Sequence, residues 1–419
     1  LGKLYHLSGD IIKAKIWYFK ALSISSTYSP ALTNLAVIDI QEGNYNQALK
    51  YLHKALKFDP TYSTAWVNIC KCYQELNNLE KESWMNSIRL DKPHEGRDEF
   101  FQTHWNRLNV LVQNPWLQAE IAAINIQAYS KENVSYVEYQ VSEGPYKNSN
   151  GELINANEAF DILRKRMKQK DILESGVIVK FQVAILRFLP NAEDQLRRAF
   201  KLVSENSDLF VGVNMVGRED NDKGFPGRFS KTLRELRHQY NNVQLAIHAG
   251  EVDEPNFHVR DTLRFGANRI GHGVNLISDP ETMLLMRHGP YMVEINLISN
   301  LLLEYINNYS EHPFPEYLRT GIPVALSTDD RGMWDSTLTD EFFVATHEFN
   351  LSWDEIKLLN QTSIQHAFLS AEIKDQLLRQ YDLKIKDFES KMSNHGINEI
   401  GPMPITRKFI CDHYKLCSN

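Results

Sequence analysis

The sequence lacks three features that would place it at once in a common class of proteins. Its 419 residues contain no run of about 18 uncharged apolar side chains, so we expect no membrane span. Its 46 basic residues are outnumbered by 53 acidic ones, which gives a net charge of −7 and no basic field for nucleic acid. It shows no signal-peptide pattern, and since its first residue is Leu rather than Met, we expect the sequence to be a fragment of a longer product. We therefore expect a cytoplasmic protein that binds neither nucleic acid nor membranes.

Cysteine is also scarce. The four cysteines, Cys70, Cys72, Cys411 and Cys417, are too few for a disulfide framework in a chain of 419 residues. No paired C-x-x-C spacing occurs, which argues against a structural zinc site made of cysteines. We expect four free thiols.

The first part of the sequence repeats itself with a period of 34 residues. Gly9 recurs as Gly43, Ala14 as Ala48, and the string Thr-Tyr-Ser at 27–29 recurs at 61–63. Small residues at fixed positions in such a period are typical of stacked helix–turn–helix units. The pattern resembles tetratricopeptide repeats, and it fails in the third unit, where Glu82 stands at a position for alanine. We assign residues 1–85 to such a helical domain, which could bind a protein or peptide partner or mediate self-assembly.

The pattern changes beyond residue 85. Helical stretches alternate with short β-rich runs, which predicts a parallel α/β sheet or barrel over residues 86–390. We favour a TIM (β/α)8 barrel, because several of the strands end in polar residues, as the active sites of such barrels require. Residues 391–419 form a tail that we cannot assign. Seven strands are expected, at Val134–Glu138, Val177–Leu186, Leu209–Asn214, Val243–Ile247, Asn268–Gly271, Tyr291–Ile295 and Pro323–Ser327.

Several of these strands end in residues that can carry chemistry. His248 and Glu251 follow the fourth strand, His272 follows the fifth, and Asp329 and Asp330 follow the last. In a barrel the carboxyl ends of the strands surround one pocket, where catalytic groups sit. Histidine and aspartate are ligands of catalytic zinc, and a nearby glutamate with a raised pKa can donate a proton. The residues alone therefore predict a metal-assisted hydrolase site.

The strings His-Ala-Gly-Glu at 248–251, Gly-His-Gly at 271–273 and Thr-Asp-Asp at 328–330 occur in this order. Together they resemble the adenosine deaminase family of metal-dependent aminohydrolases, over about residues 90–378. The resemblance implies zinc-dependent hydrolysis of the C–N bond at purine C6, with adenosine or deoxyadenosine as substrate and inosine and ammonia as products. One Zn2+ ion per chain is expected.

The resemblance also implies roles for individual residues. Glu251 would protonate purine N1, and His272 would hold the attacking water. Asp330 would hydrogen-bond purine N7 or the water, and the backbone N–H of Gly217 would meet N3. His248 and Asp329 would be zinc ligands.

Three departures from the family pattern stand out. Leu297-Ile298 replaces Pro-Thr, and Arg331 replaces the proline after the aspartate pair. The family's first strand carries an H-x-H pair with two further zinc ligands, and no H-x-H occurs in the 419 residues. Either the barrel has lost these ligands, or a segment is absent from the sequence. We favour the second explanation, because a barrel without one strand exposes two unpaired edges. It predicts a break within residues 79–90.

Alternatives to the main interpretation stay open. Arg331 weakly favours an adenine nucleotide such as AMP as substrate, although it is more often an ion-paired residue. A catalytically dead barrel that serves as an interaction scaffold is the alternative outside enzymes. We expect His312 to be a loop residue rather than a ligand, and His347 and His366 to be structural.

Overall fold

The structure, a computed structural model, describes most of the chain: residues 1–59, 62, 64–65, 68–69, 71–72, 88–90, 92, 94–148, 151–219, 223–252, 257–396 and 408–416. The chain divides into two compact units. The first comprises Leu1–Ile88, Thr103–Ala128 and Gly144–Ser175, and the second comprises Arg89–Gln102, Tyr129–Glu143 and Gly176–Asn419. The domain bounds expected at residues 85 and 390 remain a prediction.

The first unit is mainly helical. Its N-terminal helices are α1 (Gly2–Leu7), α2 (Ile11–Ile24), α3 (Ser29–Gln41) and α4 (Tyr45–Phe58). Further elements, lying wholly or largely in this unit, are α8 (Trp105–Val112), α9 (Pro115–Lys131), β2 (Tyr146–Lys147), β3 (Leu153–Ile154), α10 (Ala156–Met167) and α11 (Lys170–Leu173).

The 34-residue repeat is confirmed by the structure of these helices. Ala14 and Ala48 occupy equivalent positions, and both are completely buried, since a larger side chain would separate the crossing helices. Gly9 and Gly43 end equivalent helices with φ of 81° and 77°, a conformation that glycine adopts without a steric penalty. Of the third unit, only Thr64–Ala65, Asn68–Ile69 and Lys71–Cys72 are described, and all six residues are helical.

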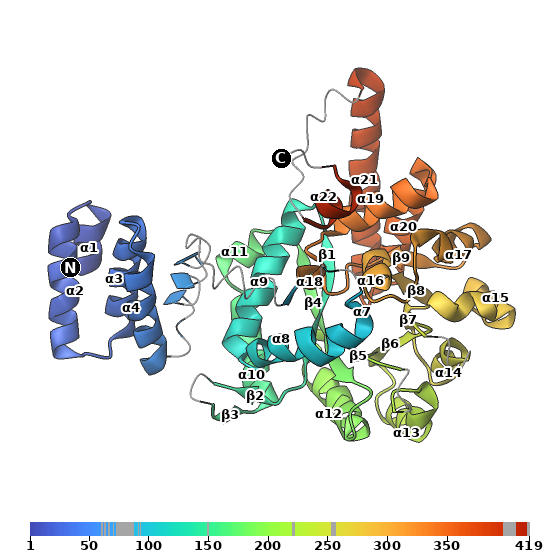
Figure 1. The fold of residues 1–419 in the computed structure, drawn as a ribbon, viewed down its shortest axis with the longest axis horizontal. Helices are drawn as coiled ribbons and strands as arrows, with labels where there is room; N and C mark the ends of the chain where they lie inside the picture. The colour runs from blue at the N-terminus through green and yellow to red at the C-terminus, as the bar shows by residue number, and fades with distance from the viewer. Residues whose placement is uncertain are drawn as a thin grey trace. The chain divides into compact units, whose positions relative to one another are not determined.

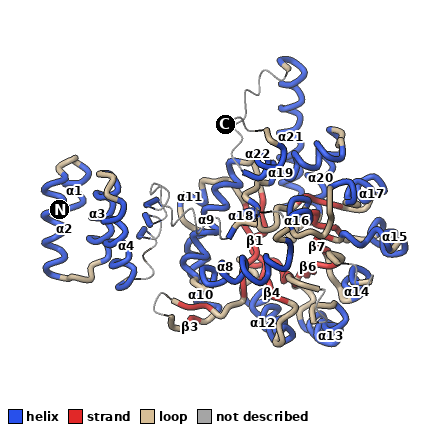
Figure 2. The backbone as a smooth tube through the Cα atoms, in the orientation of Figure 1, coloured by secondary structure: helices blue, strands red, loops and turns tan. Residues whose placement is uncertain are grey.

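The second unit is built around a parallel sheet with helices outside it (Figures 1 and 2). Its described strands follow the chain in the order β1-β4-β5-β6-β7-β8-β9, and every neighbouring pair is parallel. They are β1 (Tyr136–Ser142), β4 (Ile178–Leu186), β5 (Phe210–Val216), β6 (Gln244–Ala249), β7 (Arg269–His272), β8 (Met292–Ile295) and β9 (Val324–Leu326).

The helices of this unit precede the first strand, connect successive strands or follow the last one. They are α7 (Gly96–Glu99), the π-helix η1 (Phe100–His104), α12 (Ala192–Glu205), η2 (Pro226–Phe229), α13 (Ser230–Gln239), α14 (His258–Arg264), η3 (Val274–Ser278), α15 (Pro280–His288), α16 (Leu297–Leu302), η4 (Tyr309–Glu311), α17 (Phe314–Thr320), α18 (Arg331–Trp334), α19 (Leu338–Phe349), α20 (Trp353–Gln365), α21 (Ala371–His395) and α22 (Lys408–Tyr414).

All seven strands expected from the sequence are confirmed, with shifts of a few residues at their ends. Among the described residues, β1 and β9 are the two edges of the sheet. Side chains still connect the segments next to these edges: the Tyr129 hydroxyl lies 3.0 Å from the Thr328 hydroxyl, and Glu132 accepts a hydrogen bond of 2.9 Å from the Leu338 N–H. The break expected within residues 79–90 falls largely on residues outside the described part of the chain.

A layer of polar side chains from β1, β7 and β8 lies in the interior of the barrel. Arg269 on β7 forms ion pairs with Glu138 on β1 and, at 3.0 Å, with Glu294 on β8. Glu138 also accepts hydrogen bonds from the Tyr136 hydroxyl at 2.8 Å and the Phe368 N–H at 2.7 Å. Burial works to raise the pKa of Glu138, but the charge and hydrogen bond of Arg269 outweigh it and keep that pKa low. Since β1 and β7 are not neighbours in the sheet, their ion pair shows that the sheet curls around this layer.

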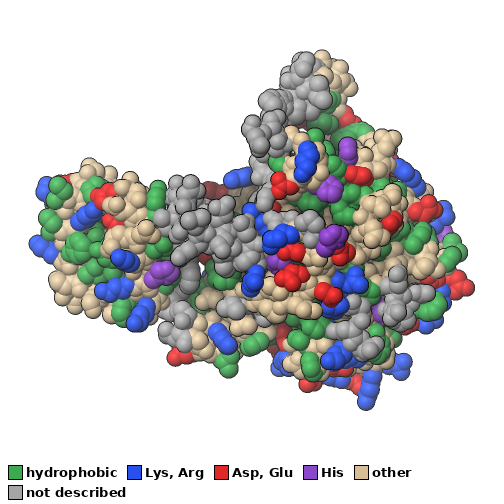
Figure 3. All heavy atoms as spheres, viewed as in Figure 1, with side chains coloured by type: hydrophobic (Ala, Val, Ile, Leu, Met, Phe, Trp, Pro, Cys, Tyr) green, Lys and Arg blue, Asp and Glu red, His purple; other side chains and the backbone are tan. Residues whose placement is uncertain are grey.

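The structure bears on the expected free thiols and on the expected absence of a membrane span. Cys72 is a buried free thiol, as expected, whereas Cys411 is disulfide-bonded, so the expectation of free thiols was wrong there. Of the described helices, none has the length and hydropathy needed to cross a membrane. Basic and acidic side chains of the described residues are interspersed on the face drawn in Figure 3.

We predict that Arg269→Met strongly destabilises the barrel, because it leaves two buried carboxylates without their cation. Loss of one partner of a buried ion pair costs about 3–5 kcal/mol, which urea unfolding followed by circular dichroism would measure. Arg264→Met is the matched control, since Arg264 is exposed and pairs only loosely with Asp261, at 3.3 Å. An equal effect of the two substitutions would contradict the role given to Arg269.

Candidate functional site

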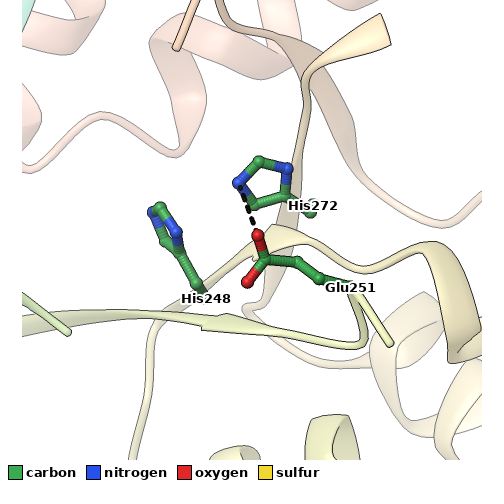
Figure 4. A group of neighbouring side chains, drawn as sticks. All are labelled: His248, Glu251 and His272. Atoms are coloured by element: carbon green, nitrogen blue, oxygen red, sulfur yellow. Dashed lines mark ion pairs between the residues drawn. The ribbon is translucent and has the colours of Figure 1, made fainter. Parts of the chain in front are cut away.

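The sequence-predicted site residues lie at the carboxyl ends of four strands, β5, β6, β7 and β9. His248 is the penultimate residue of β6, Glu251 lies two residues beyond that strand, and His272 is the last residue of β7. One ligand atom from each of these three residues lies within 4.8 Å of the others (Figure 4). The Glu251 carboxylate points toward His272, and its Oε1 lies 3.6 Å from Nε2 of that ring (Figure 4). The prediction that these strand ends converge is confirmed.

Glycines make this close approach possible. A Cβ atom on Gly271 would lie 2.4 Å from Cδ2 of His248, so any side chain at 271 would displace that imidazole. His272 has φ of 65° and Asp329 has φ of 47°, although neither is a glycine. Such strained backbone is typical of functional sites, where the surrounding structure holds it. The string Gly-His-Gly therefore has a steric explanation.

Buried charge positions Glu251. The guanidinium of Arg187, which directly follows β4, lies 2.9 Å from Glu251 Oε2 and donates to the Gly217 carbonyl at 2.7 Å. Arg187 also donates to the carbonyl of His248. Glu219 accepts hydrogen bonds from the backbone N–H groups of Glu251, at 2.7 Å, and Val252, at 3.2 Å. The loop that carries Glu251 is thus held from both sides.

The protonation of these groups follows from their surroundings. Burial raises the pKa of the Glu251 carboxyl, against the opposing charges of His272 and Arg187. Burial, together with the charges of His272 and Arg187, lowers the pKa of His248 well below its ordinary value. Glu251 therefore keeps a proton to a higher pH than an exposed glutamate, and His248 presents a neutral imidazole with a free lone pair.

The two aspartates lie beyond β9. Asp329 Oδ2 accepts a hydrogen bond of 2.6 Å from the Ser299 hydroxyl and lies 4.0 Å from Nε2 of His272. Burial, and next the charge of Asp329, raise the pKa of Asp330 well above its usual range. Asp329 is near the histidines but is not part of the closest three-residue group.

Gly217 lies at the end of β5 with φ of 88°. A Cβ there would lie 2.7 Å from the ring of Phe188, so only glycine fits at this buried position. Its carbonyl is used by Arg187, as described above. The structure therefore accounts for this glycine, while its role toward a substrate stays a prediction.

The residues that hold the site residues in place were not identified from the sequence. Arg187 and Glu219 both lie near strand ends, and Glu219 comes two residues after Gly217, which was the available signal. Asn296 and Asn300, which contact Nδ1 of His272 at 3.2 Å and 2.9 Å, lie on either side of Leu297-Ile298 and received no role from the sequence. A structural role for each of them requires contacts between distant segments, which one sequence does not reveal.

The donor set fits a divalent transition metal. Two imidazoles and carboxylate oxygens are ligands that zinc prefers, and the neutral state of His248 suits metal binding. Within the described residues the closest group is His248, Glu251 and His272 rather than the expected pair of His248 and Asp329.

The chain was compared with known proteins. The family model described as "Adenosine deaminase" matches residues 73–383, and a model described as "Tetratricopeptide repeat" matches residues 39–81. An adenosine deaminase of Enterococcus faecalis is 33% identical over 172 residues, which are 41% of this chain and half of that protein. The chain thus spans half the length of this relative.

Solved structures show the same fold. An N6-mAMP deaminase of Arabidopsis superimposes with a TM-score of 0.61 and 22% identity, over 72% of this chain and 87% of that one. An amidohydrolase of Burkholderia ambifaria with bound Zn superimposes with a TM-score of 0.63 and 16% identity, over 78% and 87% of the two chains. Since the family model covers most of the chain and the curled parallel sheet agrees, the chain belongs to the adenosine deaminase family.

Proposed function

We propose that the protein hydrolyses adenosine or deoxyadenosine at purine C6 to inosine or deoxyinosine and ammonia, with one bound Zn2+ per chain. The observation that carries this proposal is the group of His248, Glu251 and His272, whose ligand atoms lie within 4.8 Å of one another at the strand ends. Family membership and the similar Zn-containing amidohydrolase support it.

The site residues have separate roles in the proposed reaction. A zinc ion held by His248 and Asp329 would acidify water and make it a nucleophile at neutral pH. Glu251, whose pKa burial raises, donates a proton to purine N1 and so makes C6 electrophilic. Water adds at C6 and forms a tetrahedral carbon. Proton transfer to the amino group then releases ammonia, and the C6 oxygen remains in the product.

The other residues orient the reactants. His272 holds the attacking water from the side of β7. Asp330, whose pKa burial raises, can donate a hydrogen bond to N7 while it is protonated. The N–H of Gly217 meets N3, at a position where a side chain would collide with the ring of Phe188.

A nucleotide is the second candidate substrate, because the Arabidopsis neighbour is an N6-mAMP deaminase. Arg331, which pointed to this possibility in the sequence, does not support it. Its guanidinium is buried, lies 2.5 Å from Glu132 and stacks 4.3 Å from the centre of the Tyr129 ring. These contacts match the expectation of an ion-paired residue.

We also propose that the repeat region of the first unit binds a protein or peptide, because stacked helical repeats offer extended binding surfaces. The scaffold alternative, a barrel without activity, retains one argument: no H-x-H pair occurs in the sequence. Metal content and turnover distinguish the two functions.

Glu251→Gln should lower kcat for adenosine by about 10²–10⁴, because the amide cannot deliver a proton to N1. The fall in ultraviolet absorbance as adenosine becomes inosine measures the rate on zinc-supplemented protein. Glu205→Gln is the control, since Glu205 is exposed on α12 and pairs only with Lys201, at 3.8 Å. A Glu251→Gln variant as active as the parent would refute the assigned role.

His248→Ala should lose bound zinc, because it removes a neutral imidazole from the ligand group. Elemental analysis after dialysis would show one zinc per chain in the parent protein and less in the variant. His238→Ala, on the exposed face of α13, should keep the full content. A parent protein that binds no zinc would favour the scaffold alternative.

Arg331→Met tests the substrate class. We expect the ratio of kcat/KM for AMP to that for adenosine to stay unchanged, since the guanidinium is committed to Glu132 and Tyr129. The loss of AMP turnover alone would assign Arg331 to phosphate recognition.

A further inference from the structure

His312, expected to be an ordinary loop residue, lies buried next to the site. It directly follows η4, is 3% exposed, and packs against the rings of Phe314 and Phe349. Its two ring nitrogens have different partners: Nδ1 lies 3.1 Å from the N–H of Phe314, and Nε2 lies 3.0 Å from Oδ1 of Asn300. Neither partner is a charged group.

These two contacts fix the position of the proton on His312. A backbone N–H can only donate, so Nδ1 of His312 must accept and carries no proton. Burial, and next the charge of His272, lower the pKa of His312 to about 3, so the ring is neutral at physiological pH. A neutral imidazole without a proton on Nδ1 has one on Nε2. His312 therefore donates to Asn300.

The proton on His312 in turn fixes the orientation of the Asn300 amide. Oδ1 of Asn300 must face His312, because the reverse orientation would place an N–H against the N–H of His312. The Asn300 NH2 group then points to Nδ1 of His272, at 2.9 Å, and donates to it. Asn300 and His272 are both almost fully buried, so water cannot take over either contact.

We propose that Phe314 N–H, His312 and Asn300 form a one-way relay that holds His272 in the tautomer with its proton on Nε2. His312 and Asn300 are then positioning residues, which act on the reactants only through His272. The relay ends at a backbone N–H, which cannot accept a proton, so the chain of hydrogen bonds cannot reverse. The Asn296 amide nitrogen, 3.2 Å from the same Nδ1, is compatible with this state.

The relay specifies how His272 takes part in the proposed reaction, and this step rests on the proposed function. Nε2 of His272 faces Glu251 at 3.6 Å and Asp329 at 4.0 Å, so it points into the group of site residues. With its proton already on Nε2, a neutral His272 holds the water oxygen by donating a hydrogen bond to it. It does not remove the proton of the water, which must leave through one of the carboxylates.

The tautomer can be measured without turnover. Nitrogen NMR of the protein labelled with 15N-histidine distinguishes a protonated ring nitrogen from an unprotonated one, and His272→Gln assigns the signals. We expect protonated Nε2 and unprotonated Nδ1 at His272. His258 is an internal reference for the opposite state, because its Nδ1 lies 2.9 Å from the Glu219 carboxylate and so carries a proton. An Nδ1–H signal at His272 in the parent protein would overturn the proposal.

Variants test whether the relay is the cause. Asn300→Asp replaces the donor with a group that only accepts, and should move the proton of His272 to Nδ1. His312→Leu frees the Asn300 amide to turn, and should give a mixture of tautomers. His312→Gln keeps a donor near Nε2 and should preserve the parent tautomer, as should the control His347→Gln on α19.

Thermal unfolding and kcat of the same variants are also measured. Thermal unfolding identifies variants that do not fold, and His312→Leu keeps the test valid if the buried charge of Asn300→Asp prevents folding. If both variants fold and His272 keeps its proton on Nε2, the relay is refuted. Where the protein deaminates adenosine, His312→Leu should lower kcat by about 10- to 100-fold with little change in KM, and His312→Gln should restore it. Absence of turnover in the parent would count against the proposed function alone, because the NMR result does not depend on it.

Discussion

The site depends above all on one buried cation, the guanidinium of Arg187. It donates to the backbone at the ends of β5 and β6, through the carbonyls of Gly217 and His248, and it also pairs with Glu251. A guanidinium can serve several acceptors because its donors lie in a fixed plane, which a lysine cannot reproduce. Three predicted site residues at the ends of two strands, Gly217, His248 and Glu251, therefore contact the same arginine side chain. Arg187 lies 3.6 Å from Glu219 as well, so the buried charges are balanced within the site.

Burial has opposite effects on the two glutamates around this cation. Burial works against charge on Glu219, but a hydrogen bond with His258 and the charge of Arg187 hold its pKa below the usual value. The charges of His272 and Arg187 also lower the pKa of Glu251, but burial outweighs them and raises it. The first carboxylate is thus an ionised structural anchor for the loop, and the second is a carboxyl group that can hold a proton. Neighbouring groups of one residue type acquire different roles from their partners.

Local patterns in the sequence predicted much of the fold. The 34-residue repeat predicted the buried alanines and the left-handed glycines, because both follow from the geometry of single helical units. The seven strand positions followed from short β-rich runs between helical stretches, and the strand ends followed from the barrel rule. The disulfide at Cys411 was not predicted, since pairing of cysteines depends on tertiary structure.

The candidate site was predictable only in its innermost part. His248, Glu251 and His272 belong to short strings whose residue types indicate their chemistry, and the structure brings them together. Arg187 lies 64 residues from Glu251 and Asn300 lies 28 from His272, so no local pattern connects them. Arg331 shows the opposite difficulty: its position near the aspartates attracted a functional interpretation, whereas its contacts with Glu132 and Tyr129 are structural.

Glu251 and His272 both present hydrogen-bond donors to the site. Burial raises the pKa of Glu251, which favours its protonated form, and the proposed relay from Phe314 holds a proton on Nε2 of His272. Two hydrogen-bond donors thus face the same small volume, close to Asp329. Such a volume suits a group that gains negative charge during the reaction, as an oxygen that adds to a purine carbon does. In the proposed reaction His248 and Asp329 would hold the zinc ion, so Glu251 and His272 are left to act on the reactants. The arrangement of protons, as much as the identity of the residues, therefore supports the proposed hydrolytic deamination.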